Sequence, residues 1–132
     1  MTTTFKYVKD KGIHSATDYP YRGLVQTCQS VSGKKWTLSS YQEGSTCDLL
    51  LNGLQSGPVS VAIDGTALYN YKSGILTKCG SQPSSGSIAV GVTDTYWLLK
   101  MSFGMKFGEN GYIRIAPGNT CAVCQVVSFP VL

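Results

Sequence analysis

Five cysteines and one histidine are the residues of this 132-residue chain that could carry nucleophilic or metal chemistry. The six residues are His14, Cys28, Cys47, Cys79, Cys121 and Cys124. No metal site is predicted, because Cys121 and Cys124 form the single Cys-x-x-Cys pair and no second pair or histidine cluster completes a zinc ligand set. The odd number of cysteines means that at least one thiol lacks a partner within the chain, and this cysteine content favours a disulfide-forming lineage.

A nucleophilic cysteine needs a basic neighbour or a helix start, and a base that removes its proton. Cys47 lies near the start of a predicted helix and is the best placed of the five, but the sequence supplies no histidine beside it. His14 lies in a polar stretch after the end of another predicted helix, which is typical of a solvated loop histidine. The sequence therefore predicts structural cysteines, no catalytic thiol and no cofactor.

Composition limits the kinds of fold that could position these residues. Hydrophobic residues make up 42% and charged residues 14%, which excludes a disordered charged tail, and 15 glycines favour short strands and turns. Residues 1–40 hold six basic and two acidic groups, whereas residues 41–132 hold five of each. No wide electropositive face for nucleic acid is implied, and no run of about 18 apolar residues predicts a membrane span.

Two helices are predicted. The spacing of Met1, Phe5 and Val8 predicts a helix over 2–11, with Gly12 as the residue that ends it. Residues 13–33 show no sustained period and read as an ordered loop. The second helix begins at Ser45 or Thr46 as N-cap, has Asp48 in its first turn, and ends before Gly57 and Pro58.

Short apolar runs predict the strands. They are residues 35–41, 59–63, 88–92, 96–100 and 111–115. Thr93 and Asp94 are predicted to be a two-residue hairpin connection. Four or five antiparallel strands with a flanking helix predict an α+β fold with a barrel-like core.

Several motifs resemble those of the papain-like cysteine proteases, such as papain and cathepsin L. Residues 96–100 read Tyr-Trp-Leu-Leu-Lys, and residues 104–115 read Gly-Met-Lys-Phe-Gly-Glu-Asn-Gly-Tyr-Ile-Arg-Ile. Shorter matches follow in family order at residues 7–13, 19–21, 57–61, 71–75 and 128–131. The resemblance covers essentially the whole chain and only the C-terminal part of a mature enzyme. It implies a remnant of the helical left domain over 1–35 and the antiparallel β-barrel domain over 36–132.

The same resemblance indicates which residues stand at the catalytic positions. The nucleophilic cysteine and the oxyanion-hole glutamine would lie upstream of Met1, as if the chain began at an internal methionine of the pattern. Ser85 holds the position of the family histidine and Met101 that of the family asparagine, while Phe103 and Phe107 replace two tryptophans. A hydroxyl is not a useful general base near neutral pH, and a thioether accepts hydrogen bonds only weakly. We therefore expect no intact catalytic residue and no activity from this chain.

Further positions follow from the resemblance alone. Met1, Ala62, Gly86 and Val126 correspond to the apolar specificity pocket, and all are small or apolar. A hydrophobic pocket could therefore survive without catalysis. Cys79 and Cys121 match the disulfide of the barrel domain, and Cys28 matches a cysteine whose partner lies in the missing part, so it is expected to be an orphan thiol. Cys47 and Cys124 have no counterpart in papain and could pair with each other.

Three functions remain open at this point. The chain could be a non-catalytic pseudopeptidase with a structural or binding role in a larger assembly. It could be part of a cysteine endopeptidase completed by an N-terminal segment that carries the nucleophile, or a module that binds peptides or inhibitors in a residual cleft. Removal of the nucleophile helix would uncover apolar residues at Phe5, Val8, Ala62 and Ile88, which predicts a protein partner. The family implies a lysosomal or secreted compartment, but Met1–Asp10 has no apolar signal-peptide region, so no compartment is predicted.

Overall fold

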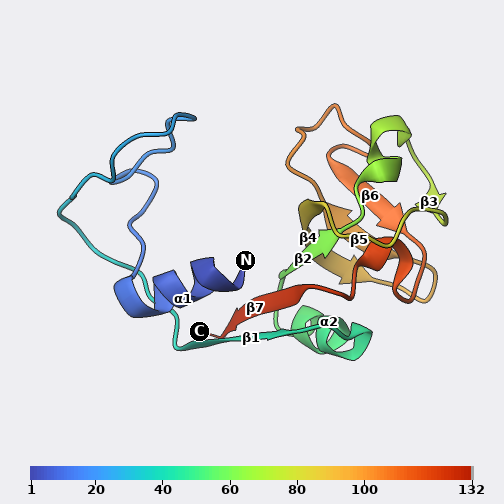
Figure 1. Ribbon diagram of the computed structural model, residues 1–132, viewed down its shortest axis with the longest axis horizontal. Coiled ribbons are helices and arrows are strands. Elements are labelled where there is room, and N and C mark those ends of the chain that lie inside the picture. The colour runs from blue at the N-terminus through green and yellow to red at the C-terminus, as the bar shows by residue number, and fades with distance from the viewer. Residues whose placement is uncertain (132) are drawn as a thin grey trace. The chain divides into compact units, whose positions relative to one another are not determined.

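The computed structural model describes residues 1–131, shown as a ribbon in Figure 1. Two compact units divide the chain: residues 1–41 with the C-terminal residues from Pro130, and residues 42–129. The sequence-based boundary after residue 35 stays a prediction, because compact units describe packing, whereas that boundary divides the two domains of a family fold.

The first unit contains one helix and a long loop. Helix α1 spans Thr2–Lys11, as predicted, and ends where the Gly12 N–H donates to Val8 O at 2.9 Å. Gly12 has φ 74°, and a Cβ there would lie 2.9 Å from Lys35 Cβ, so only glycine fits. All ten residues of α1 are at least partly exposed, and Phe5 stacks on Tyr41 with ring centroids 6.2 Å apart.

The predicted strand over 35–41 is wrong. Trp36 makes a single antiparallel bridge with Ile13, and strand β1 spans Ser40–Gly44 instead. A β-propensity for tryptophan describes packing on a half-buried sheet, but Trp36 is 56% exposed. Its ring lies under Lys34, whose Nζ is 3.8 Å from the ring centroid.

In the second unit, α2 spans Cys47–Leu54 and begins as the sequence predicts. The Thr46 side chain is the N-cap and accepts a hydrogen bond from Leu49 N at 3.2 Å, and Asp48 lies in the first turn. Leu50 of this helix is fully buried. Gly53 lets the helix pack closely on Val59 and Phe129, because a Cβ at position 53 would lie 2.7 Å from Val59 and 2.8 Å from Phe129.

The remaining elements surround the hydrophobic core. They are β2 (Val59–Ile63), the 3-10 helix η1 (Thr66–Asn70), β3 (Ile75–Leu76), β4 (Ser85–Val92), β5 (Trp97–Lys100), β6 (Tyr112–Ile115), η2 (Thr120–Ala122) and β7 (Val127–Val131). The strand order is β1-β7-β2-β4-β5-β6-β3. The α+β class is therefore confirmed, and every second residue of β2 is fully buried.

The predicted barrel closure is wrong, because the sheet is open, with β1 at one edge and β3 at the other. The sheet is also not purely antiparallel. The two-residue strand β3 pairs with β6 in parallel, with Ile75 opposite Arg114. A strand of two residues presents too little backbone to continue the ladder around to β1.

Two turns differ from the sequence-based reading. The β4–β5 connection spans Thr93–Tyr96 rather than two residues, and Thr93 N donates to Tyr96 O at 2.9 Å. The Thr93 hydroxyl accepts from the N–H groups of Thr95 and Tyr96, each at 3.2 Å, and so stabilises the longer loop. A tight turn before β6 has φ 57° at Asn110 and 92° at Gly111, which is the Asn-Gly hairpin signal that the strand prediction overlooked.

Candidate functional site

The two predicted acid–base positions lie at the ends of neighbouring strands. Ser85 is the first residue of β4 and lies opposite Ile63 of β2. Because side chains alternate along a strand, Ser85 and Ser87 share the face on which Ile63 and its neighbours are buried. Met101 directly follows β5, whose last residue pairs with Ile88, so Met101 lies across from Ser87.

Met101 contacts Ser87 directly. Ser87 Oγ lies 3.1 Å from Met101 Sδ and also 3.1 Å from the carbonyl oxygen of Lys100. Ser87 and Met101 are 8% and 5% exposed, and Ser85 is half-buried. The structure thus brings Met101 against β4 two residues from Ser85, on the same face of the strand.

Neither Ser85 nor Met101 can accept and release a proton near neutral pH. A serine hydroxyl is neutral over that whole range, and a thioether carries no proton. Phe103, predicted to stand in place of a sheltering indole, is 53% exposed and packs edge to face on Phe107 at 4.9 Å. Ser85, Met101 and Phe103 therefore contribute a neutral hydroxyl, a thioether and an aromatic ring.

Three of the four predicted pocket residues lie together in the second unit. Ala62 is directly opposite Gly86 across the β2–β4 pair, and the Ala62 N–H donates to Val126 O at 3.1 Å. Gly86 is exposed and Val126 is 40% exposed, so solvent reaches this apolar surface. Met1 belongs to the first unit and is 42% exposed.

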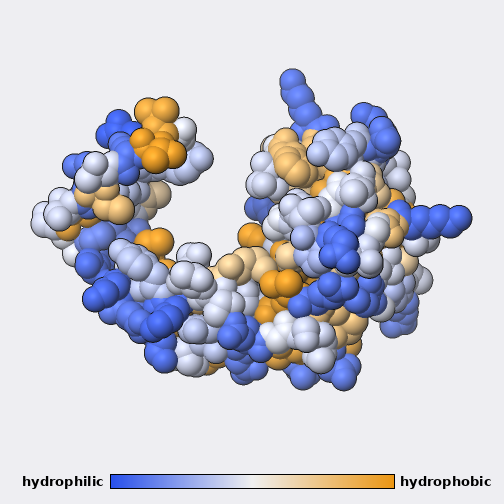
Figure 2. Space-filling view, viewed as in Figure 1, coloured by the Kyte–Doolittle hydropathy of each residue, from blue (hydrophilic) through white to orange (hydrophobic). Residues whose placement is uncertain are grey.

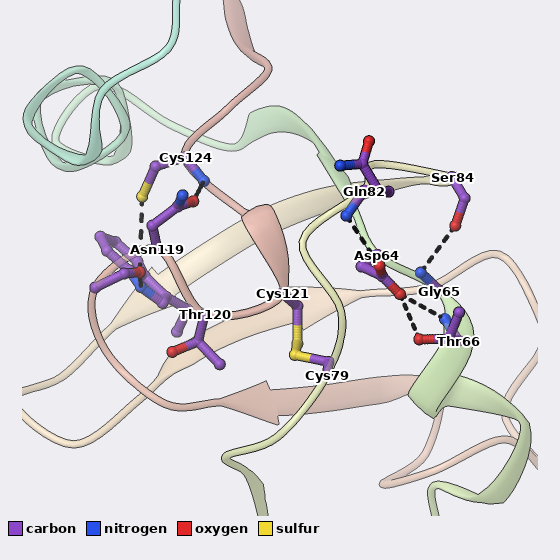
Figure 3. Close-up of a disulfide and its surroundings, with 12 residues drawn as sticks. Asp64, Gly65, Thr66, Cys79, Gln82, Ser84, Asn119, Thr120, Cys121 and Cys124 are labelled. Carbon is purple, nitrogen blue, oxygen red and sulfur yellow. Dashed lines mark hydrogen bonds between the residues drawn. A yellow bond between two sulfur atoms is a disulfide. The ribbon is translucent and has the colours of Figure 1, made fainter.

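A buried carboxylate anchors the segment that leads into β4 (Figure 3). Asp64, 3% exposed, accepts hydrogen bonds from Thr66 Oγ1, Thr66 N and Gln82 N at 2.5, 3.0 and 3.0 Å. The hydroxyl and the two backbone donors lower the pKa of Asp64 below its ordinary value. Gly80 packs so closely on the carboxylate that a Cβ there would lie 2.2 Å from Oδ2. Sequence reasoning missed this residue, although an aspartate that directly follows a buried strand is a signal for such a network.

Two disulfides hold the second unit together. The predicted Cys79–Cys121 bridge is present, with Cα atoms 5.2 Å apart, and joins the segment before β4 to η2 (Figure 3). Cys47 and Cys124 also form a disulfide, which settles the pairing that the sequence left open. Asn119 Oδ1 accepts a hydrogen bond from Cys124 N at 3.0 Å. Among residues 1–131, Cys28 is the free cysteine and is exposed.

His14 differs from the expected solvated histidine. It is half-buried, and its buried Nδ1 finds no hydrogen-bond partner among residues 1–131. The bridge that the preceding residue, Ile13, forms with Trp36 restricts the backbone here. His14 belongs to the first unit and Ser85 to the second.

A second polar network, also missed from the sequence, connects η1, β3 and β6. Glu109 accepts from Arg114 Nε at 2.8 Å, from Arg114 Nη2 at 2.5 Å and from Gly74 N at 2.9 Å. Tyr71 donates its hydroxyl proton to Gly74 O at 2.8 Å and accepts from Arg114 N at 3.2 Å. The Arg114 guanidinium and the Gly74 N–H lower the pKa of Glu109 to about 2.

The described residues offer neither a metal site nor a membrane-spanning helix. Within residues 1–131, no group of three His, Cys, Asp or Glu side chains is placed to hold a metal ion. Over the same residues, no helix has both the length and the apolar character needed to cross a membrane.

Comparison with known proteins identifies the class. The family model described as "Papain family cysteine protease" matches residues 1–131. This chain therefore belongs to the papain family of cysteine proteases, and the predicted resemblance is confirmed.

Individual relatives with similar sequences are named as cathepsins. "Cathepsin L 2" of Paramecium tetraurelia is 38% identical over 100% of this chain and 43% of its own length. "Cathepsin S" of Bos taurus is 37% identical over 98% of this chain and 44% of its own length. The chain thus spans less than half the length of these curated relatives.

Solved structures confirm the papain-like fold. The Carica candamarcensis cysteine protease CMS1MS2 in complex with E-64 matches 98% of this chain and 67% of its own, with a TM-score of 0.90 and 30% identity. Digestive procathepsin L 3 of Tenebrio molitor matches 100% of this chain and 48% of its own, with a TM-score of 0.87 and 34% identity.

Proposed function

We propose that this chain is a non-catalytic member of the papain family, with a structural or binding role in a larger assembly. The observation that carries the proposal is the pair Ser85 and Met101. They stand where the family motifs place a histidine and an asparagine, and they lie on one face of the sheet beside Ser87. Membership of the family gives the fold, and the chemistry of these two positions argues against the family reaction.

Peptide hydrolysis by a thiol needs a base that activates it and an acid that protonates the leaving amine. Ser85 supplies neither. A thiol without such a base keeps an ordinary pKa near 8.5 and is mostly protonated at neutral pH. General acid–base catalysis contributes roughly 10²- to 10⁴-fold, so this loss alone removes most of the activity, whichever chain supplies the cysteine.

A protein partner is proposed from the exposure of apolar side chains; Figure 2 shows the most hydropathic residues at the surface in orange. In the first unit, six large apolar side chains are at least half exposed: Tyr7, Ile13, Tyr21, Leu24, Val25 and Trp36. An open hollow of about 1010 Å³ is bordered by several of them, including Ile13 and Val25. In the second unit, Ile88 is 43% exposed. Apolar surface of this kind marks an interaction site, so we expect a polypeptide that completes the papain-like fold, as another segment or as a separate protein.

A second candidate function is peptide binding at the second unit. It is favoured by one observation, the contiguous and solvent-reached surface of Ala62, Gly86 and Val126. Small and apolar residues leave room for an apolar peptide side chain there. A peptide pull-down distinguishes this candidate from a purely structural role.

The deciding experiment supplies the nucleophile. The N-terminal part of the mature Paramecium relative, with its nucleophilic cysteine, is fused before this chain, and hydrolysis of a fluorogenic peptide is measured. We expect no thiol-dependent turnover from the unmodified fusion. The matched control is the same fusion with Ser85→His and Met101→Asn, which are expected to be necessary for any activity. Thiol-dependent turnover by the unmodified fusion, blocked by an epoxide inhibitor, would overturn the proposal.

A further inference from the structure

Ser87 lies beside both Ser85 and Met101 and is not itself one of the proposed acid–base positions. It is on the face of β4 that carries Ser85, and it is 8% exposed. Its single hydroxyl proton has two acceptors at 3.1 Å, Met101 Sδ and Lys100 O. Because one hydroxyl donates one proton, the two acceptors share it.

Methionine is an adaptable side chain, with three rotatable bonds and a soft sulfur that accepts weak hydrogen bonds. At position 101 it is 5% exposed, and the contact with Ser87 restricts which rotamers place the sulfur against β4. We propose that Ser87 is a positioning residue, which fixes the Met101 thioether against β4 and engages any hydrogen-bonding group placed at position 101. This inference rests on the proposed function, since it concerns the positions at which acid–base catalysis is argued to be lost.

The proposal has a consequence for restoring the site. In a Met101→Asn variant, the new amide oxygen lies within reach of the Ser87 hydroxyl. To orient an imidazole introduced by Ser85→His, the same oxygen must accept a hydrogen bond from an imidazole N–H. An amide oxygen accepts up to two hydrogen bonds, so Ser87 competes in part for this acceptor, and the two substitutions alone give an imidazole whose orientation is only partly fixed.

The first test uses the unmodified chain and a double-mutant cycle. Ser87→Ala and Met101→Leu are measured singly and together by denaturant unfolding. We expect their effects on the unfolding equilibrium constant to deviate from a simple product by at least about threefold, because the residues are in contact. The control pairs Met101→Leu with Ser60→Ala, a half-buried serine on β2, and is expected to be multiplicative. A multiplicative result for Ser87 and Met101 would overturn the proposal.

The second test reads the imidazole directly. The ¹⁵N spectrum of the Ser85→His, Met101→Asn variant is compared with that of the same variant carrying Ser87→Val, which replaces the hydroxyl by methyl groups and so removes the donor. We expect Ser87→Val to raise, by at least about twofold, the population of the tautomer whose N–H donates to the amide introduced at position 101, with His14 as an unchanged internal reference. Equal populations would overturn the competition. Turnover by the unmodified fusion would overturn the proposed function and leave both results in place, so the two failures are distinguishable.

Discussion

At the scale of single residues, the proposed loss of activity rests on two neutral side chains. The family motifs predict that Ser85 and Met101 stand where a histidine and an asparagine are expected, and Met101 contacts Ser87 on the face of β4 that carries Ser85. The contact of Met101 with Ser87 could not be predicted, because it depends on the register of β4 and β5, in which Ile88 lies opposite Lys100.

Glu109 provides a pH-dependent test of its network. Its pKa falls from the ordinary 4.5 to about 2, because Arg114 and Gly74 N–H bind the ionised carboxylate. Its contribution is therefore fully present above about pH 4.5 and is lost as the pH falls towards about 2. We expect Glu109→Gln to lower the free energy of unfolding at pH 7 by on the order of 2 kcal/mol. In urea unfolding, the difference from the unmodified chain should shrink below about pH 4.5.

The matched control is Glu43→Gln, at an exposed position of β1. It should change stability by less than about 0.5 kcal/mol at every pH. A Glu109→Gln difference that stays constant between pH 7 and pH 2.5 would contradict the assignment of the shift to the ionised carboxylate.

At the scale of elements, the sequence predicts best where local chemistry decides. The N-cap of α2 at Thr46 and the strand over Val59–Ile63 are confirmed, because capping and alternation act over a few residues. The strand predicted over 35–41 fails, because tertiary contacts limit Trp36 to one bridge with Ile13. Barrel closure fails for the same kind of reason, since strand number and register are set by the whole sheet.

The two disulfides are expected to contribute similarly to stability. Cys47–Cys124 closes a loop with a sequence separation of 77, and Cys79–Cys121 one of 42. Restriction of the unfolded chain is worth about 4 kcal/mol for loops of this length. We expect the double replacement Cys47→Ser with Cys124→Ser to lower the free energy of unfolding by about that amount. Cys28→Ser is the control and should have no effect, and a loss below about 1 kcal/mol for the double replacement would contradict the entropic role.

The turn before β6 tests a backbone requirement. Asn110 has φ 57°, a region that asparagine and glycine enter more readily than alanine. We expect Asn110→Ala to cost about 1 kcal/mol in thermal or denaturant unfolding, whereas Asn110→Gly should be nearly neutral. Equal costs for the two variants would show that the Asn110 side chain, rather than the backbone, stabilises the turn.

At the scale of the whole molecule, the two units differ in how much core they hold. The second unit contains both disulfides and the buried residues of the sheet, whereas every residue of α1 is at least partly exposed. The sequence predicted uncovered apolar residues, and Phe5, Val8 and Ala62 are half-buried while Ile88 is 43% exposed. The partner that would cover them stays a prediction, because nothing in a single chain identifies a second surface.

Exposure of this kind predicts the behaviour of the chain expressed alone. We expect it to bind a hydrophobic dye, to aggregate at high concentration, and to show a first unit that unfolds apart from the disulfide-linked second unit, because exposed apolar patches are aggregation hazards. Dye fluorescence, calorimetry and sedimentation at dilute concentration measure this. A dye-negative monomer with one sharp two-state transition would contradict the need for a partner.

The central claim is that no base stands beside the nucleophile position, and the pH dependence of thiol alkylation tests it most directly. In the fusion that supplies the nucleophilic cysteine, iodoacetamide alkylation of that cysteine is followed by mass spectrometry from pH 5 to pH 9. Because the thiolate is the reactive form, the cysteine of the unmodified fusion should react as an ordinary thiol, with an alkylation rate that reaches half its maximum near pH 8.5. The Ser85→His, Met101→Asn fusion should react faster at pH 5 to 6, where an adjacent imidazolium stabilises the thiolate. Equally fast alkylation of the unmodified fusion at pH 5 would contradict the claim.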